Sequence, residues 1–416
     1  MSDRLPGFRD FYPEPLPAAD AWSCDLRQHL FERWRETARR YGFREYDGPP
    51  LELLELYTNK SGAEIVAQLF NFTDKGDRAV ALRPEMTPTV ARMIASSERA
   101  YRKPVKWFSI PQLFRYEKQQ KGRLREHFQL NCDIFGEADG SADAEIIALL
   151  IDVLRALGLT AEDFVIRLSS RQAWQRFFSA KGGDPARAYD FYQVVDKIDR
   201  ERPEVSAERL APLGILLEDV QAFIAASVPE PELQAVLDNL SARGLGEYLR
   251  VDYGVIRGLA YYTGVVFEAF DRKGEFRAIA GGGRYDQLIH QVSNGRVNLP
   301  ALGFGMGDVV LAELLKSRGL VPSFAGRVTA VVLIEDEGMR SESLRLVQGL
   351  REAGHATDYA LTPAKGDKQF KRAIDLGALH TVRLERAADG ALMARVKDLK
   401  SRTERVVMPA DVSSLL

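Results

Sequence analysis

The 416-residue sequence contains very little cysteine. Only Cys24 and Cys132 occur, in unrelated contexts. Two such residues cannot build a disulfide framework, and they lack the clustered cysteine and histidine spacing of a zinc site. We therefore expect a reducing, cytoplasmic location and no structural metal held by the protein.

The sequence also lacks long apolar runs and a charge excess of either sign. It has no stretch of about 18 uninterrupted apolar residues, and its start, MSDRLPGFRDFYPE, has no apolar signal region. We therefore expect neither membrane insertion nor export. With 57 Lys and Arg against 59 Asp and Glu, the net charge is -2. That balance argues against nonspecific coating of nucleic acid but allows local basic sites.

The length predicts two or three domains. Residues 164–250 contain helical segments separated by glycine, proline and polar breaks, which indicates a mostly helical module inserted into an antiparallel sheet domain. Residues 316–327 read as a linker, and strands and helices alternate after it, which is typical of a mostly parallel α/β domain covered on both faces. The predicted boundaries are 1–163 and 251–317 for the sheet domain, 164–250 for the helical insertion and 327–416 for the α/β domain.

Several local elements follow from periodicity and turn residues. Apolar residues at i, i+4 steps predict a helix over 18–41 that stops at Gly42. The segment LFNFTDKGDRAVALRP predicts a hairpin, followed by a helix from about Thr87. Glycines 281–283 suit either close approach of backbone to a ligand or a simple loop.

The stretch 104–137 predicts two long antiparallel strands joined by a basic loop. In the second strand the side chains alternate, so one set faces a core and the other a polar site. The core set is Phe128, Leu130, Cys132 and Ile134, and the polar set is Gln129, Asn131 and Asp133. Arg115 and Glu117 share a face of the first strand. The loop charges indicate either an anion site or an ordinary hairpin with a solvated basic tip.

The order of the motifs resembles class II aminoacyl-tRNA synthetases and, among them, the histidyl-tRNA synthetase family. The motifs are YGFREYDGPPLE, ALRPEMTPTVAR, FRYEKQQKGRLREHFQLNCDIFG, RGLAYYTGVVFE, GGGRYDQL and ALGFGMG, and together they span nearly the whole chain. The resemblance implies an α+β fold. It would consist of a class II antiparallel-sheet catalytic domain with a helical insertion, plus a C-terminal α/β anticodon-binding domain.

The resemblance also implies a reaction. Histidine and ATP would form histidyl-adenylate and pyrophosphate, and histidine would then pass to the 3' end of tRNA(His). Magnesium would accompany ATP, bound mainly to its phosphates. In the family, the residue matching Arg115 grips the α-phosphate and the amino acid carboxylate, and the residue matching Arg257 approaches from the other side. Planar arginine forks suit such oxygen pairs.

The remaining site residues are likewise implied by the resemblance. The histidine-binding set is Glu85, Thr87, Arg115, Gln129, Asp133, Arg257, Tyr261, Tyr262 and Tyr285. The ATP-binding set is Arg115, Glu117, Arg123, Arg125 and Phe128, with the Phe128 ring under the purine, which conflicts with the core-facing position that alternation gives it. Gln120 and Lys121 would meet the tRNA acceptor end. The first helix and the following strand would form a homodimer interface.

The sequence departs from the family pattern at three places. Ala260 stands where aspartate is common, Met86 where glycine is common, and Asp308, Val309 and Val310 where an arginine usually holds the γ-phosphate. We therefore expect Arg123 or Arg125 to bind the terminal phosphates. Two other functions fit a similar core. One is the histidine-sensing regulatory subunit of ATP phosphoribosyltransferase, which typically lacks the last domain, and the other is a weakened synthetase-like RNA binder.

Overall fold

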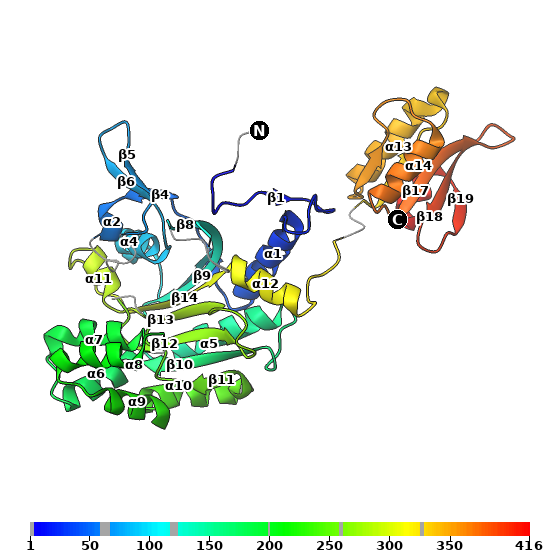
Figure 1. The fold of residues 1–416 in the computed structure, drawn as a ribbon. Helices are drawn as coiled ribbons and strands as arrows, with labels where there is room; N and C mark the ends of the chain where they lie inside the picture. Colours follow the sequence, from blue (N-terminus) through cyan, green and yellow to red (C-terminus); the bar gives the residue numbers. More distant parts are fainter. Residues whose placement is uncertain (1–3, 59–66, 117–123, 199, 258–260, 325–327) are drawn as a thin grey trace. The chain divides into compact units, whose positions relative to one another are not determined.

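The computed structural model describes residues 4–58, 67–116, 124–198, 200–257, 261–324 and 328–416 (Figure 1). The chain divides into two compact units, Met1–Val321 and Pro322–Leu416. Each unit is described by itself below.

A nine-stranded sheet forms the centre of the first unit, in the order β11-β10-β12-β13-β14-β9-β7-β3, with β8 paired to β9. The pairs from β10 to β7 are antiparallel, while the outer pairs β10–β11 and β3–β7 are parallel. This sheet with its flanking helices confirms the predicted α+β fold. The strands are β3 (Arg44–Glu45), β7 (Val105–Ser109), β8 (Gln112–Phe114), β9 (Glu126–Phe135), β10 (Phe164–Ser170), β11 (Leu249–Val251), β12 (Val265–Asp271), β13 (Ala280–Arg284) and β14 (Ala301–Gly307).

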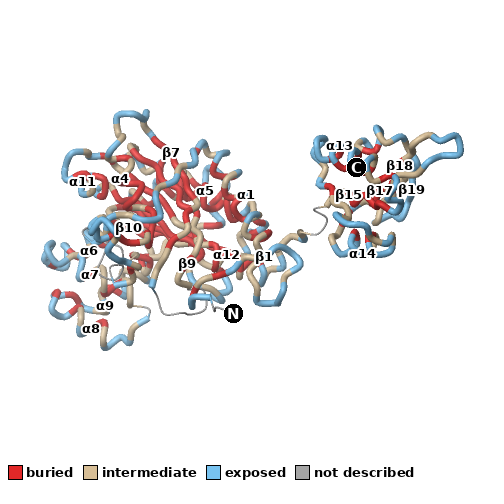
Figure 2. The backbone as a smooth tube through the Cα atoms, turned by 90° about the horizontal axis from the view of Figure 1, so that it is seen from above, coloured by how far each residue is buried: buried red, intermediate tan, exposed pale blue. Residues whose placement is uncertain are grey.

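Helices α1 (Cys24–Arg40), α5 (Gly140–Arg155) and α12 (Asp308–Ser317) pack against this sheet and against one another. Helix α5 is buried along most of its length, as the red tube in Figure 2 shows, because it lies between the sheet and its neighbours α1 and α10 (Pro231–Ala242). Helix α1 ends before Gly42, whose φ is +78°, as predicted. Its start lies later than predicted, because Trp22–Ser23 pair with Phe11–Tyr12 as strands β2 and β1.

The helical module comprises α6 (Arg171–Ala180), α7 (Ala188–Val195), α8 (Pro203–Leu210), α9 (Leu217–Ala226) and α10. Its helices pack around the buried Trp174 ring, whose neighbours include Phe191 and Phe223 at centroid distances of 5.6 and 4.7 Å. The predicted boundary at residue 164 lies seven residues before the first helix of the module, α6. The run FVIRLSS is strand β10, and its apolar and β-branched residues suit a strand buried on both faces.

A small three-stranded sheet, ordered β4-β6-β5, lies beside the large one. Its strands are β4 (Leu51–Leu53), β5 (Asn71–Thr73) and β6 (Ala79–Leu82), with the short helix α2 (Glu55–Thr58) nearby. The antiparallel pairing of β5 with β6 confirms the predicted hairpin, and Asp77 in its turn has a φ of 58°. Helix α4 (Thr87–Ser97) then begins at the predicted residue and packs with α11 (Leu288–Val292).

The second unit contains a five-stranded sheet in the order β16-β15-β17-β18-β19. Helices α13 (Arg340–Glu352) and α14 (Gly366–Asp375) cover opposite faces, because Val332 packs with α13 and its neighbour Val331 with α14. The prediction of a mostly parallel sheet is wrong, since two of the four pairings, β17–β18 and β18–β19, are antiparallel. The strands are β15 (Ala330–Leu333), β16 (Thr357–Tyr359), β17 (His380–Arg386), β18 (Leu392–Asp398) and β19 (Glu404–Val407).

No single helix in the described part of the chain is long and apolar enough to cross a membrane. One helix pair, Pro203–Leu213 with Leu217–Ala242, meets the length and composition criteria together, but it is bent by 106°.

Candidate active site

A cavity of about 640 Å³ lies over the middle of the large sheet. Strands β9, β12, β13 and β14 and the start of α12 contribute to its walls, and the helical module reaches its rim through Arg200. Of the predicted site residues, Arg115, Gln129 and Arg257 line this cavity. The sheet thus brings together Arg115 and Arg257, which lie 142 positions apart in the sequence.

Strand β9 presents His127 and Gln129 to the cavity, whereas Phe128 points to the other face of the sheet. The Phe128 ring packs 6.1 Å from Phe11 and 5.2 Å from Phe31 of α1. The expectation that Phe128 lies under a purine is therefore wrong, because adjacent side chains of a strand point to opposite faces. Strict use of the alternation in the sequence would have selected His127 instead.

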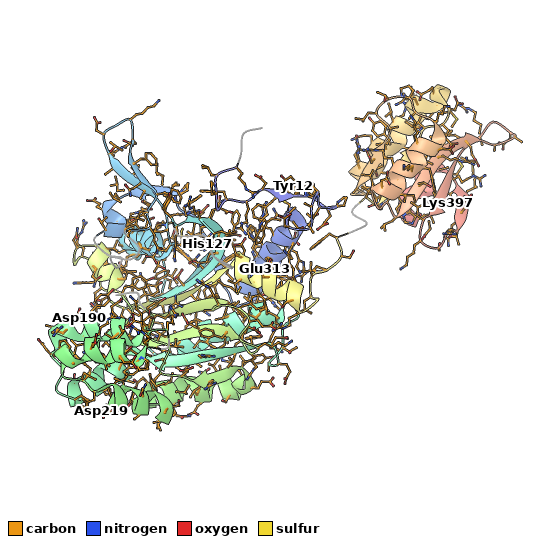
Figure 3. The ribbon with its side chains drawn as sticks, viewed as in Figure 1. Tyr12, His127, Asp190, Asp219, Glu313 and Lys397 are labelled. Carbon is orange, nitrogen blue, oxygen red and sulfur yellow. The ribbon has the colours of Figure 1, made fainter. Side chains whose placement is uncertain are left out.

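His127, which is labelled in Figure 3, is thus the ring of β9 that lines the cavity. Burial, together with the nearby charges of Arg115 and Arg9, lowers the pKa of His127 to about 3. Its imidazole is consequently neutral at physiological pH, so its ring can pack against a ligand without adding charge.

Arg115 projects from the loop edge just after β8. Its Nε donates a hydrogen bond of 2.9 Å to the Pro84 carbonyl, and its backbone N–H donates one of 2.9 Å to the Arg125 carbonyl. The predicted first strand of the hairpin is interrupted at Ile110 and Pro111, and it forms the two shorter strands β7 and β8 on either side of them. Proline cannot donate to a strand ladder, which is why a break occurs at this position.

Arg257 reaches the cavity from the segment after β11. Its Nη1 donates to Glu268 Oε1 at 2.8 Å, and its Cζ lies 5.5 Å from the Tyr262 ring centroid. Burial alone would lower the pKa of Arg257, but Tyr262 and Glu268 raise it above the ordinary value. Arg257 therefore stays cationic, and Glu268, which the sequence did not single out, is its ion-pair partner.

Glycines on β13 and β14 make room for the side chains of the site. A Cβ on Gly281 would overlap the Arg257 guanidinium, one on Gly303 would overlap the Asp133 carboxylate, and one on Gly305 would lie 2.7 Å from Gln129 Cδ. The alternative of a simple loop at glycines 281–283 is wrong, because they form part of β13. Gly281 accommodates the Arg257 side chain, whereas a Cβ on Gly282 or Gly283 would come closest to a backbone carbonyl oxygen of a neighbouring strand or loop.

The other predicted histidine-binding residues form a buried cluster beside the cavity. The Tyr261 hydroxyl donates to Glu85 Oε2 at 3.0 Å, and the Tyr285 hydroxyl donates to Asp133 Oδ1 at 2.5 Å. Thr87 also interacts with the Tyr261 hydroxyl. Tyr262 links this cluster to the cavity through its contact with Arg257.

The Asp133 carboxyl of this cluster has a pKa far above its ordinary value of 3.8. Burial raises its pKa to about 7, and the hydrogen bond from Tyr285 opposes part of that rise. A carboxyl in such surroundings binds a cation more readily once it has lost its proton.

The start of α12 gives the cavity an apolar wall, made by Val309 and Val310. The preceding Asp308 points away from solvent, with its side chain 4% exposed, and accepts hydrogen bonds from Arg9 at 2.8 Å and from the Phe128 N–H at 3.0 Å. Arg9 also donates to Glu126 Oε1 at 2.7 Å. These three residues form a buried ion-pair network that no local sequence pattern predicts.

Two exposed arginines, Arg200 and Arg277, lie at the rim of the cavity. Arg125, which we expected to bind phosphate, instead places its guanidinium 4.1 Å from the Tyr116 ring centroid and is not among the described residues that line the cavity. Four further predicted residues, Glu117, Gln120, Lys121 and Arg123, lie outside the described residues. So does Ala260, while Met86 is fully buried.

A large antiparallel sheet backed by helices, with arginines reaching one pocket from two sides, is the architecture of a class II aminoacyl-tRNA synthetase catalytic domain. A model of the histidyl-tRNA synthetase family matches residues 14–308. The histidine–tRNA ligase of Opitutus terrae is 44% identical over 99% of this chain and 97% of its own length. The chloroplastic/mitochondrial histidine–tRNA ligase of Arabidopsis thaliana is 36% identical over 94% of this chain and 82% of its own length. The chain belongs to the histidyl-tRNA synthetase family.

Solved structures agree on the fold. Histidyl-tRNA synthetase from Nostoc sp. PCC 7120 superposes with a TM-score of 0.76 at 22% identity, covering 97% of this chain and 96% of its own. The apo histidyl-tRNA synthetase of S. aureus superposes with a TM-score of 0.73 at 21% identity, covering 100% of this chain and 99% of its own. At this identity the similarity concerns the fold alone.

Proposed function

We propose that the chain is a histidine–tRNA ligase, which joins histidine to ATP as histidyl-adenylate and then transfers histidine to tRNA(His). The observation that carries this proposal is the convergence of Arg115 and Arg257 on one cavity in a chain of this family. The reaction brings a carboxylate and a triphosphate together, so two fixed cations in one pocket supply the charge that the anions require.

In this proposal a carboxylate oxygen of histidine attacks the α-phosphorus of ATP, and the bond to the β-phosphate oxygen breaks to release pyrophosphate. Arg115 and Arg257 bind the α-phosphate oxygens from two sides as negative charge develops on them. Magnesium enters with ATP as part of the substrate and is held chiefly by its phosphates. Because the arginines act most strongly in the transition state, their loss lowers kcat more than it raises KM.

The buried cluster supplies histidine recognition. Asp133, Glu85 and Gln129 offer oxygens to the ammonium group of the substrate, and the tyrosines pack around its ring. Buried polar groups of this kind reject amino acids that leave them unpaired. The partners these groups have now, such as Tyr285 for Asp133, keep them oriented before substrate arrives.

For ATP, we assign His127 to the face of the purine and the rim arginines Arg277 and Arg200 to the terminal phosphates. Both arginines line the cavity, and the α12 wall beside them is apolar. The Arg125 guanidinium lies over the Tyr116 ring, which argues against its binding a phosphate of ATP. The roles of Glu117 with the nucleoside, Arg123 with phosphate, and Gln120 and Lys121 with the tRNA end stay predictions.

The second unit is the proposed anticodon-binding domain. A cavity of about 690 Å³ on it is lined by the basic residues Lys371, Arg383, Arg395 and Lys397, together with several acidic ones. RNA loops are read largely through splayed bases and phosphates, which such a mixed surface can bind. A homodimer is also proposed, supported by Leu51 and Leu53 of β4, which are 36% and 47% exposed.

The histidine-sensing alternative has a structural relative, a protein from Bacillus halodurans C titled ATP phosphoribosyltransferase regulatory subunit/histidyl-tRNA synthetase. It superposes with a TM-score of 0.72 at 21% identity, covering 92% of this chain and 98% of its own. The ligase assignment has more support, because relatives at 36% to 44% identity that span both units are named histidine–tRNA ligases.

The test is pyrophosphate exchange into ATP, driven by each of the twenty amino acids in turn, followed by charging of tRNA(His). We expect exchange with histidine alone. The Arg115→Met variant should lose at least about 100-fold in kcat, the cost of removing one preorganised charge donor. Histidine binding without exchange by the wild-type chain would instead support the sensor.

Histidine activation should depend on pH through Asp133. The pKa of this carboxyl is about 7 in the folded protein, so acidification neutralises the group that pairs with the substrate ammonium. The kcat/KM for histidine should therefore fall roughly tenfold per pH unit below pH 7. Asp133→Asn should remove this dependence and leave only the titration of free histidine itself.

The Asp133 carboxyl also affects the stability of the folded protein. As pH rises, this stability should fall while activity rises. Because the folded pKa of the carboxyl is raised above the ordinary value of 3.8, its stabilising contribution is complete below that value and is lost as pH rises through about 7. Activity that rises together with stability over this range in wild type, but not in Asp133→Asn, would contradict the assignment.

A further inference from the structure

A buried arginine of the helical module lies against the backbone of Arg257. Arg171 is the first residue of α6 and is 3% exposed. Its Nη2 donates a 2.5 Å hydrogen bond to the Arg257 carbonyl oxygen. It is not one of the described residues that line the cavity. Any effect of Arg171 on a substrate is therefore transmitted through Arg257.

The guanidinium of Arg171 also contacts helix α7. Its Cζ lies 4.3 Å from the Tyr192 ring centroid. Burial lowers the pKa of Arg171 to about 10, while Tyr192, Asp196 and Tyr189 favour its charged form, so it remains a cation at neutral pH. A desolvated cation thus joins two helices of the module to the segment that carries Arg257. Cation–π contacts of this kind strengthen when water is excluded.

Arg257 needs such support because its backbone is unfavourable. Its φ is 57°, in the left-handed region that residues with a Cβ rarely adopt. A residue persists there only where its surroundings fix it on several sides. Glu268 holds the side chain at 2.8 Å, and Arg171 holds the carbonyl at the other end of the residue.

We propose that Arg171 is a positioning residue for histidine activation. By holding the Arg257 carbonyl, it maintains the left-handed backbone that directs the Arg257 guanidinium into the cavity. The position of Arg257 then depends on how α6 and α7 pack, so the helical module contributes to the geometry of the active site. This inference rests on the proposed function, in which Arg257 binds the α-phosphate.

The test compares Arg171→Met in the wild-type and Arg257→Met backgrounds by histidine-dependent pyrophosphate exchange. In the wild type, Arg171→Met should lower kcat about 10- to 100-fold, the scale expected when a reacting group is misplaced by about 1 Å. The KM values for histidine and ATP should change by less than about threefold. In the Arg257→Met background, Arg171→Met should cost less than about twofold more, because residues that act as a unit are not additive.

Arg187→Met is the matched control, since Arg187 is an exposed arginine of the same module that pairs with Asp190. It should leave kcat unchanged. If Arg171→Met does not fold, Tyr192→Leu and Tyr192→Phe decide the matter. Leucine removes the ring that holds Arg171 and should lower kcat, whereas phenylalanine keeps the ring and should not.

Equal losses from Arg171→Met in both backgrounds, or an unchanged kcat in the wild type, would overturn the inference. So would equal kcat values for the two Tyr192 variants. Failure of the wild-type chain to exchange pyrophosphate with histidine would instead contradict the proposed function, so the two failures are distinguishable.

Discussion

Gly281→Ala should lower kcat/KM for histidine activation about 100- to 1000-fold, the range measured when one preorganised donor is lost from an active site. The added Cβ would overlap the Arg257 guanidinium. That guanidinium is the far end of a flexible side chain, so it can move aside, and the protein should still fold. The measurement is pyrophosphate exchange together with a thermal unfolding curve.

Gly140→Ala is the control for this substitution. Gly140 begins α5, and a Cβ there would meet only Val236 Cγ2, at an ordinary contact distance of 3.6 Å. Its activity should equal that of the wild type. Combining Gly281→Ala with Arg257→Met should give the same activity as Arg257→Met alone, since the glycine acts through that arginine. A fully active Gly281→Ala would show that the position of Arg257 is not needed.

Arg9→Met should destabilise the first unit by about 3–5 kcal/mol, because it leaves two buried carboxylates without their cation. The Arg9 and Glu126 side chains are both 1% exposed, and that of Asp308 is 4% exposed. The network also fixes the N-terminal segment against the start of β9 and of α12, which flank the cavity. Urea unfolding followed by tryptophan fluorescence measures the effect, since all four tryptophans of the chain lie in the first unit.

Two further variants should be compared with Arg9→Met. Arg4→Met removes an exposed ion pair with Asp10 from the same segment and should cost no more than about 1 kcal/mol. Adding Glu126→Gln and Asp308→Asn to Arg9→Met removes the uncompensated charges and should recover much of the lost stability. An Arg9→Met variant as stable as Arg4→Met would contradict the role assigned to the network.

Local patterns predicted much of this fold. The alternation in β9, the apolar spacing of α1 and the turn in the β5–β6 hairpin all appear as expected, because each depends on neighbours within a few residues. The predicted boundary of the helical module at residue 164 includes the strand FVIRLSS, because a short apolar run by itself does not show to which domain it belongs. The antiparallel half of the second sheet was missed although Asp389 and Gly390, with a φ of 87° at Gly390, form a typical turn signal.

The site itself was predicted only in part. Arg115, Gln129 and Arg257 do meet at one cavity. The motif resemblance placed Phe128 in the site, but strand geometry places His127 there. Arg125 was chosen for its charge, yet its contact with Tyr116 directs it elsewhere, and the rim arginine Arg277 comes from a segment with no motif signal.

By itself, the sequence determined the family, several of the helices and strands and the pair of arginines, because these follow from residue type and short-range spacing. Only the tertiary structure decided which cations face the cavity, why Gly281 must lack a side chain, and how Arg9 and Arg171 support the site. The reason is that each of these contacts joins residues far apart in the chain. Their distances are set by how the strands pair and how the helical module packs, and no local pattern encodes either.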